Sequence, residues 1–445
     1  MQRASKDRLG IIEKSKTMTE SSGDQPPFSA ITDALADLHA TSRWQERVYK
    51  QLHAHPELSF QETKTAALAA SKLKELGYEV LEGIGRTGVV GVLRNGEGQT
   101  VLARADMDAL PVKENTGLRY ASTLTATDDA GEIVSVAHAC GHDAHVTCLL
   151  GAAELLAKAR GSWGGTFIAL FQPAEEVAGG AKAMVADGLR ERIPKPDVAF
   201  SQHVLAHPAG TIGTQVGPVL SAGDSIRITL HGKGSHGSMP HNSVDPVVLA
   251  ALVVLRFQTI VSRETKPGDF AVLTVGSSVA GSKSNIISDR AVLLVNLRTY
   301  DMAVRQRMID SIERMVRAEC EASGSPHPAE FEYYDQYPLT ENDPEVTEKI
   351  TSAFQSHFGS ETVFSLGRVT ASEDFSHVPD ALGTPYTYWG VGCTDPEKYE
   401  QALKAGRVEQ DIPVNHSEFF APVIEPTLSA GTQALVVAAL TYLAK

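Results

Sequence analysis

The chain has 445 residues, of which 42% are hydrophobic and 21% are charged, and its formal net charge is −14 at pH 7. These values are those of a folded protein with two or three domains, and they argue against a fibrous or disordered chain. The acidic balance argues against nucleic acid and anionic membrane surfaces as partners, because both are bound by basic faces.

The N-terminal residues and the cysteines predict a cytoplasmic protein. Residues 1–28 are polar and mixed in charge, so we expect a disordered tail without the apolar segment of a signal peptide, and Met18 is an alternative native start. The longest apolar run, Val247 to Leu255, is too short to cross a bilayer. The cysteines, at positions 140, 148, 320 and 393, are too sparse for a disulfide framework, which favours a reducing compartment.

The first half of the chain predicts an α/β core. The elements expected in chain order are helical residues 29–76, strands 89–93 and 100–105, a helix at 147–159, and strands 165–172 and 198–203. Asn95-Gly96 is a hairpin signal between the first two strands. Strands that alternate with helices favour an α/β fold, in which the ligand site lies beyond the carboxyl ends of the strands.

The pattern changes near Ala222, where a second unit begins. Its expected elements are a strand at 225–232, a helix at 245–263, strands at 270–279 and 290–298, a helix at 304–323 and a strand at 330–334. This order is the signature of a ferredoxin-like α+β domain. Helices and short strands then return and end in a helix at 426–443. We therefore expect a core of residues 29–222 and 338–445, with an inserted domain at 223–337.

The densest group of metal-binding side chains lies in residues 138–145. Cys140 and His142 are two residues apart, so both side chains point the same way in an extended loop, and thiolate and imidazole suit borderline divalent metals. A histidine-rich helix cap with a buried cysteine would give the same pattern. A polar and acidic insertion, Thr123 to Ser135, precedes the group and has no assigned function.

Other polar side chains follow apolar strands, where a core residue would not be charged. Glu175 and Glu176 are adjacent, so only one of them can present its carboxylate to a metal while the other faces a reactive water. An acidic first turn of a helix is the alternative. Asp106-Met107-Asp108 ends one strand, His203 follows another, and His416 lies near the C-terminus. Each is weak alone, and their co-occurrence favours a site.

These motifs resemble the dinuclear metallopeptidase family of aminoacylases, dipeptidases and glutamate carboxypeptidases. More narrowly they resemble its amidohydrolase branch of hippurate hydrolases, auxin-conjugate hydrolases and N-acyl-amino-acid deacylases. The motifs that carry the resemblance are His53 to Leu58, Ala105 to Pro111, His138 to His145, Gln172 to Glu176, Gly234 to His241, Asn285 to Ile287, Ser372 to Phe375, and His416.

The resemblance implies two divalent ions, of zinc, manganese, nickel or cobalt, held in the core. The implied ligands are a bridging Cys140 with His142, Glu176, His203 and His416. Glu175 would be the general base. The wider family has His-x-Asp where this chain has Asp106-Met107-Asp108, so His142 replaces that ligand, Asp108 becomes a supporting residue and Asp106 has no firm role. His138 and His145 are possible substitutes for His142.

The resemblance also implies an inserted lid that dimerises. His236 would donate to the carbonyl oxygen, acting in its own subunit or in the partner's, and Asn285 and Arg298 would hold the substrate's free carboxylate. The implied reaction is hydrolysis of an N-acyl amino acid by a metal-activated water, which yields a carboxylic acid and an amino acid. Alternatives are a metal-dependent dipeptidase or carboxypeptidase, a catalytically inactive dimeric binding protein, and a structural-zinc protein.

Overall fold

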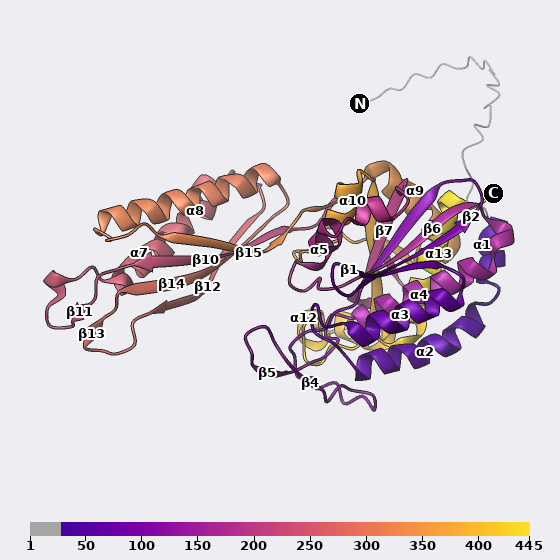
Figure 1. The fold of residues 1–445 in the computed structure, drawn as a ribbon, viewed down its shortest axis with the longest axis horizontal. Helices are drawn as coiled ribbons and strands as arrows, with labels where there is room; N and C mark the ends of the chain where they lie inside the picture. The colour runs from indigo at the N-terminus through magenta and orange to yellow at the C-terminus, as the bar shows by residue number, and fades with distance from the viewer. Residues whose placement is uncertain (1–27) are drawn as a thin grey trace, which may run out of the picture.

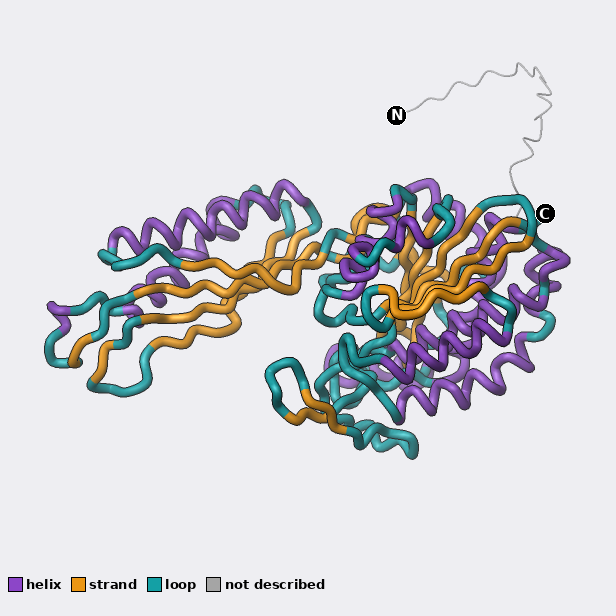
Figure 2. The backbone as a smooth tube through the Cα atoms, viewed as in Figure 1, coloured by secondary structure: helices purple, strands orange, loops and turns teal. Residues whose placement is uncertain are grey.

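The computed structural model describes residues 28–445 and shows two lobes side by side. The larger lobe holds the first and last parts of the chain, and the middle of the chain forms an elongated lobe beside it (Figures 1 and 2). Residues 1–27, with Met18, lie outside the described residues, so the expected tail stays a prediction. We call the two lobes the core and the lid.

An eight-stranded mixed sheet forms the centre of the core. In spatial order its strands are β1 (Glu79–Ile84), β2 (Gly88–Asn95), β6 (Gly165–Gln172), β3 (Thr100–Asp106), β7 (Val198–Pro208), β18 (Tyr386–Thr394), β8 (Ile212–Thr214) and β17 (Val363–Ser365). Strands β6, β3, β7 and β18 run parallel to one another. Their carboxyl ends therefore meet at one edge, as the α/β expectation requires.

Helices cover both faces of this sheet, which confirms the predicted fold class. One face packs on α1 (Phe28–Leu35), α2 (Leu38–Ala54), α3 (Thr63–Glu75), α4 (His142–Lys158), α9 (Pro344–Phe358) and α13 (Ile424–Leu443). The other face packs on α5 (Gly180–Ala186), α6 (Leu189–Arg192) and α10 (His377–Leu382). Strand β6 is buried along its whole length because it is covered on both sides.

The hairpin predicted at Asn95-Gly96 is wrong. Strand β6 lies between β2 and β3, antiparallel to β2 and parallel to β3. The Asn95-Gly96 turn therefore crosses over a neighbouring strand instead of joining two paired ones. A strand that is buried along its whole length, such as β6, gains most from partners on both edges, and this tertiary pairing overrides the local turn signal.

The lid has the predicted strand–helix–strand–strand–helix–strand order. Its elements are β10 (Ala222–His231), α7 (Pro246–Thr259), a π-helical turn (Ile260–Glu264), β12 (Ala271–Ala280), β14 (Arg290–Thr299), α8 (Met302–Ala322) and β15 (Glu330–Tyr337). The antiparallel sheet runs β12-β14-β10-β15, which is the ferredoxin-like arrangement. The domain boundaries at residues 223 and 337 stay a prediction.

Small elements complete the two lobes. They are the hairpin β4 (Thr125–Thr127) and β5 (Ile133–Ser135), the pair β9 (Gly217–Leu220) and β16 (Thr340–Asn342), the pair β11 (Ser235–His236) and β13 (Ile286–Ile287), helices α11 (Pro396–Lys404) and α12 (Val408–Asp411), and short 3₁₀ turns at Arg160–Ser162 and Pro240–Asn242. The β11–β13 pair lies at the end of the lid farthest from the core (Figure 1).

One helical stretch, Pro246–Glu264, is long and apolar enough by length and composition to cross a membrane, with a third of its residues buried. Its inner side packs in the lid core through Leu249, Val253 and Phe257. Its outer side exposes Val248 and Leu255. The stretch is therefore a lid helix with an uncovered apolar face.

Candidate metal centre

The loop before α4 is shaped so that Cys140 and His142 lie side by side. Gly141 between them has a φ of 89° and precedes the first residue of α4. A Cβ atom at Gly141 would lie 2.3 Å from Val204 Cγ2, so both the backbone conformation and the packing favour glycine. Helix α4 thus begins at His142, five residues before the predicted start.

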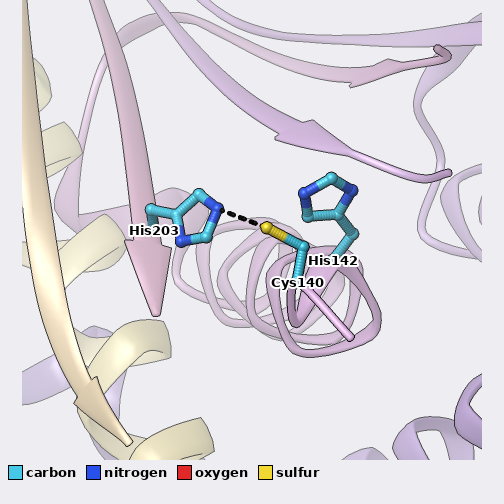
Figure 3. A group of neighbouring side chains, drawn as sticks. All are labelled: Cys140, His142 and His203. Atoms are coloured by element: carbon cyan, nitrogen blue, oxygen red, sulfur yellow. Dashed lines mark hydrogen bonds between the residues drawn. The ribbon is translucent and has the colours of Figure 1, made fainter. Parts of the chain in front are cut away.

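Cys140, His142 and His203 face a common point (Figure 3). The Cys140 sulfur lies 3.4 Å from His203 Nε2, close to the separation of about 3.5 Å between two donors on one tetrahedral zinc ion. His203 lies within β7, which runs on to Pro208 because it continues past its pairing with β3 to pair with β18. Its Nδ1 donates to the Val204 carbonyl at 2.8 Å, which leaves Nε2 for a metal.

His142 is held in the same way. Its Nδ1 lies 2.9 Å from the Asp108 carbonyl oxygen, to which it donates, and its Nε2 is buried with no hydrogen-bond partner among the described residues. Glu176 Oε1 is buried and unpartnered as well, 3.7 Å from that Nε2. Two buried polar atoms that face each other without a protein partner are atoms that a shared cation would satisfy.

His416 completes the group from the C-terminal segment. Its Nε2 lies 3.3 Å from Glu176 Oε2, and its own backbone N–H donates to the Ala139 carbonyl. The neighbouring Asn415 amide donates to the carbonyls of Cys140 and Val204. These bonds tie the C-terminal segment to the metal loop, and His416 adopts a φ of 71° there.

Two groups of potential ligands therefore share Cys140. Cys140, His142 and His203 have donor atoms within 4.8 Å of one another, and so do Cys140, Glu176 and His416. A thiolate common to both groups is the arrangement expected of a bridging ligand. The thiolate, imidazole and carboxylate donors fit two borderline divalent ions.

Asp108 supports the carboxylates and does not join the ligands. Its Oδ1 accepts the N–H of Glu175 at 3.1 Å, and its Oδ2 accepts the N–H of Glu176 at 3.0 Å and the Ser59 hydroxyl at 2.7 Å. Asp108 thereby fixes the turn that presents the two glutamates.

Asp106, for which the sequence offered no role, links two buried groups. Its carboxylate accepts from Arg104 at 2.7 Å and from His145 Nδ1 at 2.5 Å. His145 Nε2 in turn accepts the N–H of Val204 at 2.9 Å. Both nitrogens of His145 are therefore committed, which argues against this residue as a substitute ligand. Its ring packs on His203 instead.

His138 also lies apart from the ligand groups. It is 2% exposed, and neither ring nitrogen has a hydrogen-bond partner among the described residues. Burial lowers its pKa to about 4, so its ring is neutral at pH 7. It borders a small cavity with His53 and Glu114 on the other side of the metal loop. It belongs to no ligand group, which argues against it as a substitute for His142.

Glu175 lies in a buried acidic cluster that sequence reasoning missed. Its carboxylate is within 4.8 Å of those of Glu373 and Asp374, and Arg104 donates to Glu373 at 2.8 Å and to Asp374 at 3.3 Å. Burial and the Glu373 charge raise the pKa of Glu175 well above its ordinary value. The motif Ser372 to Phe375 was the only signal in the sequence for this cluster.

Three of the candidate ligands, Cys140, Glu176 and His142, hold protons that a cation would have to displace. Burial raises the pKa of the Cys140 thiol well above its ordinary value and that of Glu176 to about 8. Burial lowers the pKa of His142, but Asp106 and Asp108 outweigh it and raise the pKa to about 10. Because metals bind the deprotonated forms, cation binding releases protons and tightens as the pH rises.

The three lid residues do not lie together. His236 is exposed on the β11–β13 pair, where its Nδ1 meets the Ser238 hydroxyl at 2.8 Å, and Asn285 accepts the Gly237 N–H through its carbonyl. Arg298 is at the other end of the lid sheet and donates to the Ser372 hydroxyl of the core at 2.6 Å. Thus His236 and Asn285 share the far end, and Arg298 borders the metal centre.

Known proteins resemble this chain in sequence and in fold. A family model described as Peptidase family M20/M25/M40 matches residues 102–425. The hippurate hydrolase of Campylobacter jejuni is 38% identical over 350 residues, which are 77% of this chain and 87% of that protein. Thermostable carboxypeptidase 1 of Saccharolobus solfataricus is 36% identical over 367 residues, 81% of this chain and 89% of that protein.

Solved structures show the same two-lobed architecture. A putative aminohydrolase from methicillin-resistant Staphylococcus aureus superposes with a TM-score of 0.78 at 29% identity, covering 92% of this chain and 99% of that one. A Bacillus subtilis protein described as a dinuclear metal binding peptidase from the M20 family gives a TM-score of 0.71 at 26% identity, covering 90% and 98%.

Proposed function

The chain belongs to peptidase family M20/M25/M40, and from this premise we propose that it is a metal-dependent amidohydrolase of N-acyl amino acids. The products are a carboxylic acid and a free amino acid. Relatives named hippurate hydrolase and N-acetyl-L-cysteine deacetylase support this reaction class at 38% and 34% identity. The observation that carries the proposal is the convergence of four potential ligand side chains on a shared Cys140, with Glu175 beside them.

The proposed ligands are Cys140, His142, Glu176, His203 and His416. Two divalent ions held there supply polarisation of the amide carbonyl and acidification of an attacking water. Zinc, manganese, nickel and cobalt all accept this donor set. The buried and unpartnered atoms of His142 and Glu176 support the assignment.

Glu175 is proposed as the general base. Its backbone N–H donates to Asp108, and Tyr337 donates to its backbone carbonyl oxygen at 3.2 Å, so its main chain is held from both lobes. The raised pKa of Glu175 suits a group that takes a proton from water and returns it to the leaving amine. Arg104 balances the acidic cluster around it and keeps the carboxylates in place.

The position of His236 supports an action across a dimer. We call the place where β10 and β15 join the core the hinge. Strand β10 has ten residues, so at about 3.3 Å per residue it carries the chain about 30 Å from the hinge, and His236 lies beyond the end of this strand. Glu175 contacts Tyr337, which pairs with Gly223 at the hinge. A rigid lid that rotates about this hinge keeps His236 distant from its own Glu175. The donor to the carbonyl oxygen therefore comes from a partner subunit.

A homodimer formed through the lid would bring His236 and Asn285 of one subunit to the metal centre of the other. The outer face of α7 exposes apolar side chains, and β12 and β15 are edge strands of the lid sheet. Pairing of such an edge or face is a common way to cover it, and closed two-fold dimers are the commonest oligomers. Asn285 would then reach the site together with His236 from the partner subunit. Arg298 would come from the subunit that holds the metals and would bind the substrate carboxylate beside them.

A carboxypeptidase activity is the second candidate. Thermostable carboxypeptidases 1 and 2 of Saccharolobus solfataricus are each 36% identical to this chain. The C-terminal residue of a peptide and an N-acyl amino acid present the same amide next to a free carboxylate. The acyl side of the substrate distinguishes the two reactions.

A substrate panel tests the function. The purified protein, loaded in turn with zinc, manganese, nickel or cobalt, is assayed on N-acetyl and N-benzoyl amino acids, on dipeptides and on N-blocked peptides. Faster hydrolysis of the N-acyl amino acids supports the proposal. A preference for unblocked dipeptides would establish a dipeptidase instead, and a protein that keeps two metals but hydrolyses nothing would establish a binding protein.

We also place the enzyme in the cytoplasm. All four cysteines of the chain, which lie in the described part, are free and buried, as expected in a reducing compartment. Fractionation of cells that express the full chain tests this placement.

A further inference from the structure

The insertion before the metal loop forms a projecting hairpin. Strands β4 and β5 pair from Thr125 with Ser135 to Thr127 with Ile133. Figures 1 and 2 show this hairpin leaving the core on the side that lies beneath the lid. We call residues 124–135 the arm.

The root of the arm is anchored beside the metal centre. Ala126 and Val134 pack on Leu58 and Ala109, and Val136 is buried in the same cluster. Ala109 directly follows Asp108, which holds the turn of Glu175 and Glu176. The residue after Val136, Ala137, pairs with Leu110, and the chain then runs into the metal loop. The arm therefore stands at the approach to the ligands.

The apolar side chains of the arm are largely open to solvent, although the Thr127 carbonyl accepts a hydrogen bond from the Gln61 amide at 3.0 Å. Ile133 is 78% exposed and Leu124 is 39% exposed. The arm carries Asp128, Asp129 and Glu132 and no basic residue. An exposed isoleucine with three carboxylates is a surface that needs an apolar and basic counterpart.

The far end of the lid offers that counterpart. We call residues 233–242 and 281–287 the lid tip. It carries Lys233, Lys283, His236 and His241 and no acidic residue. Its apolar side chains Met239 and Ile286 are 50% and 51% exposed. The tip thus matches the arm in charge and in apolar exposure.

We propose that the arm docks the lid tip of a second copy of this chain and so holds the partner's tip over the metals. The proposal depends on the proposed function, in which His236 and Asn285 reach the site from the partner. The arm is rooted beside Asp108, which holds the turn of Glu175. The partner's lid tip would therefore pass the arm as it approaches Cys140 and Glu175. Contact of Ile133 with Ile286, and of Glu132 with Lys283, fixes the tip where His236 is needed.

Crosslinking between two differently tagged chains tests the contact. One chain carries Ile133→Cys and the other Ile286→Cys, and the metal-loaded dimer is treated with a short bismaleimide in the presence of N-benzoylglycine. The four native cysteines are buried, so the introduced ones are the reactive sites. We expect a band of two joined chains. Leu403→Cys, 60% exposed on α11 of the core, replaces Ile133→Cys as the control and should give no such band.

Charge reversal gives a second measurement. Glu132→Lys and Lys283→Glu should each lower kcat/KM about threefold, as expected for an exposed pair, and the double variant should recover the loss. Glu97→Lys, which lies in the β2–β3 turn, should neither lower kcat/KM nor rescue Lys283→Glu. No recovery in the double variant, or an equal band with Leu403→Cys, overturns the proposal.

A separate experiment tests the premise that His236 acts in the partner's site, independently of whether the arm docks the lid tip. Mixing His236→Ala with Glu175→Gln subunits tests action across the dimer without using the arm. If mixing restores activity but the arm crosslinks no better than Leu403, the docking proposal is wrong and the proposed function stands. If mixing restores nothing, the tip does not act in the partner's site and the docking proposal loses its premise.

Discussion

The core and the lid bury their functional groups to opposite degrees. In the core, Cys140, His142 and Glu175 are buried and each is held by a residue of the same chain. In the lid, β12 alternates between half-buried and exposed residues and β14 between buried and half-buried ones, and His236 and Asn285 lie exposed at the far end. The core is a preorganised site for cations, whereas the lid presents groups that become useful only against another surface.

This difference separates the variants into two classes. Substitutions in the core should abolish metal binding or catalysis in the subunit that carries them, and a second chain should not repair that site. Changes at the lid tip should leave the metal centre intact and should be repairable by another chain. The tests below run from the largest expected effect to the smallest.

The largest expected effect is that of Cys140→Ala. A thiolate shared by two ligand groups is needed by both ions, so the variant should lose at least one ion and fall to background turnover. Metal analysis by mass spectrometry together with an N-acetyl amino acid assay measures both effects. Cys148→Ala, a buried cysteine in α4 outside the ligand groups, is the control. Two retained ions in Cys140→Ala would contradict the bridging role.

Glu175→Gln should preserve the metals and abolish the chemistry. Loss of a general base costs about 10²–10⁴-fold in kcat, and the amide keeps the size of the side chain. Turnover and metal content are measured on the same preparation. If the ions leave as well, Glu175 and Glu176 have exchanged roles.

His236→Ala should have a smaller effect, about 10²-fold in kcat, as for the loss of one oxyanion donor. Its metal content should match the wild type because the lid tip does not belong to the ligand groups. His241→Ala, also exposed at the tip, is the matched control. Wild-type turnover in His236→Ala would remove this residue from the mechanism.

The smallest effect concerns the support of the core. Burial lowers the pKa of His53, but Asp143 and Glu114 hydrogen-bond it and raise its pKa from 6.5 to about 10. A raised folded-state pKa stabilises the protein fully below pH 6.5, and that stability is lost as the pH rises through 10. His53→Gln should therefore cost about 2 kcal/mol at low pH and flatten the loss of stability between these values.

Urea unfolding across this pH range measures the effect in His53→Gln. His55→Gln, an exposed neighbour at the end of α2, serves as the control. An unchanged pH slope in His53→Gln would show that the ion pair does not contribute.

The sequence predicted the fold class and the lid topology because these follow from apolar periodicity and element order. It also singled out the five ligand candidates, which the structure brings together. It misjudged the Asn95-Gly96 hairpin, because the insertion of β6 between β2 and β3 is a long-range pairing. The strand predicted to end at His203 continues to Pro208 for the same reason, since pairing with β18 extends β7.

The lid residues show a second limit. Asn285 and Arg298 are close in the sequence, and both were expected at the substrate carboxylate. Strand β14 begins five residues after Asn285 and runs from the lid tip toward the core, so it leaves Asn285 at the tip and places Arg298, near its end, against the core. Only the direction of a strand in space reveals this separation. The same separation places His236 at the tip, far from its own metal centre, which favours action in the partner subunit.

The most direct test of that proposal is to mix His236→Ala and Glu175→Gln subunits and measure turnover of an N-acetyl amino acid. If His236 serves the partner's metals, a mixed dimer contains one intact site, and random pairing of equal amounts restores about a quarter of wild-type activity. Activity that stays at the sum of the two separate variants would contradict the account, because it would mean that each lid serves its own core.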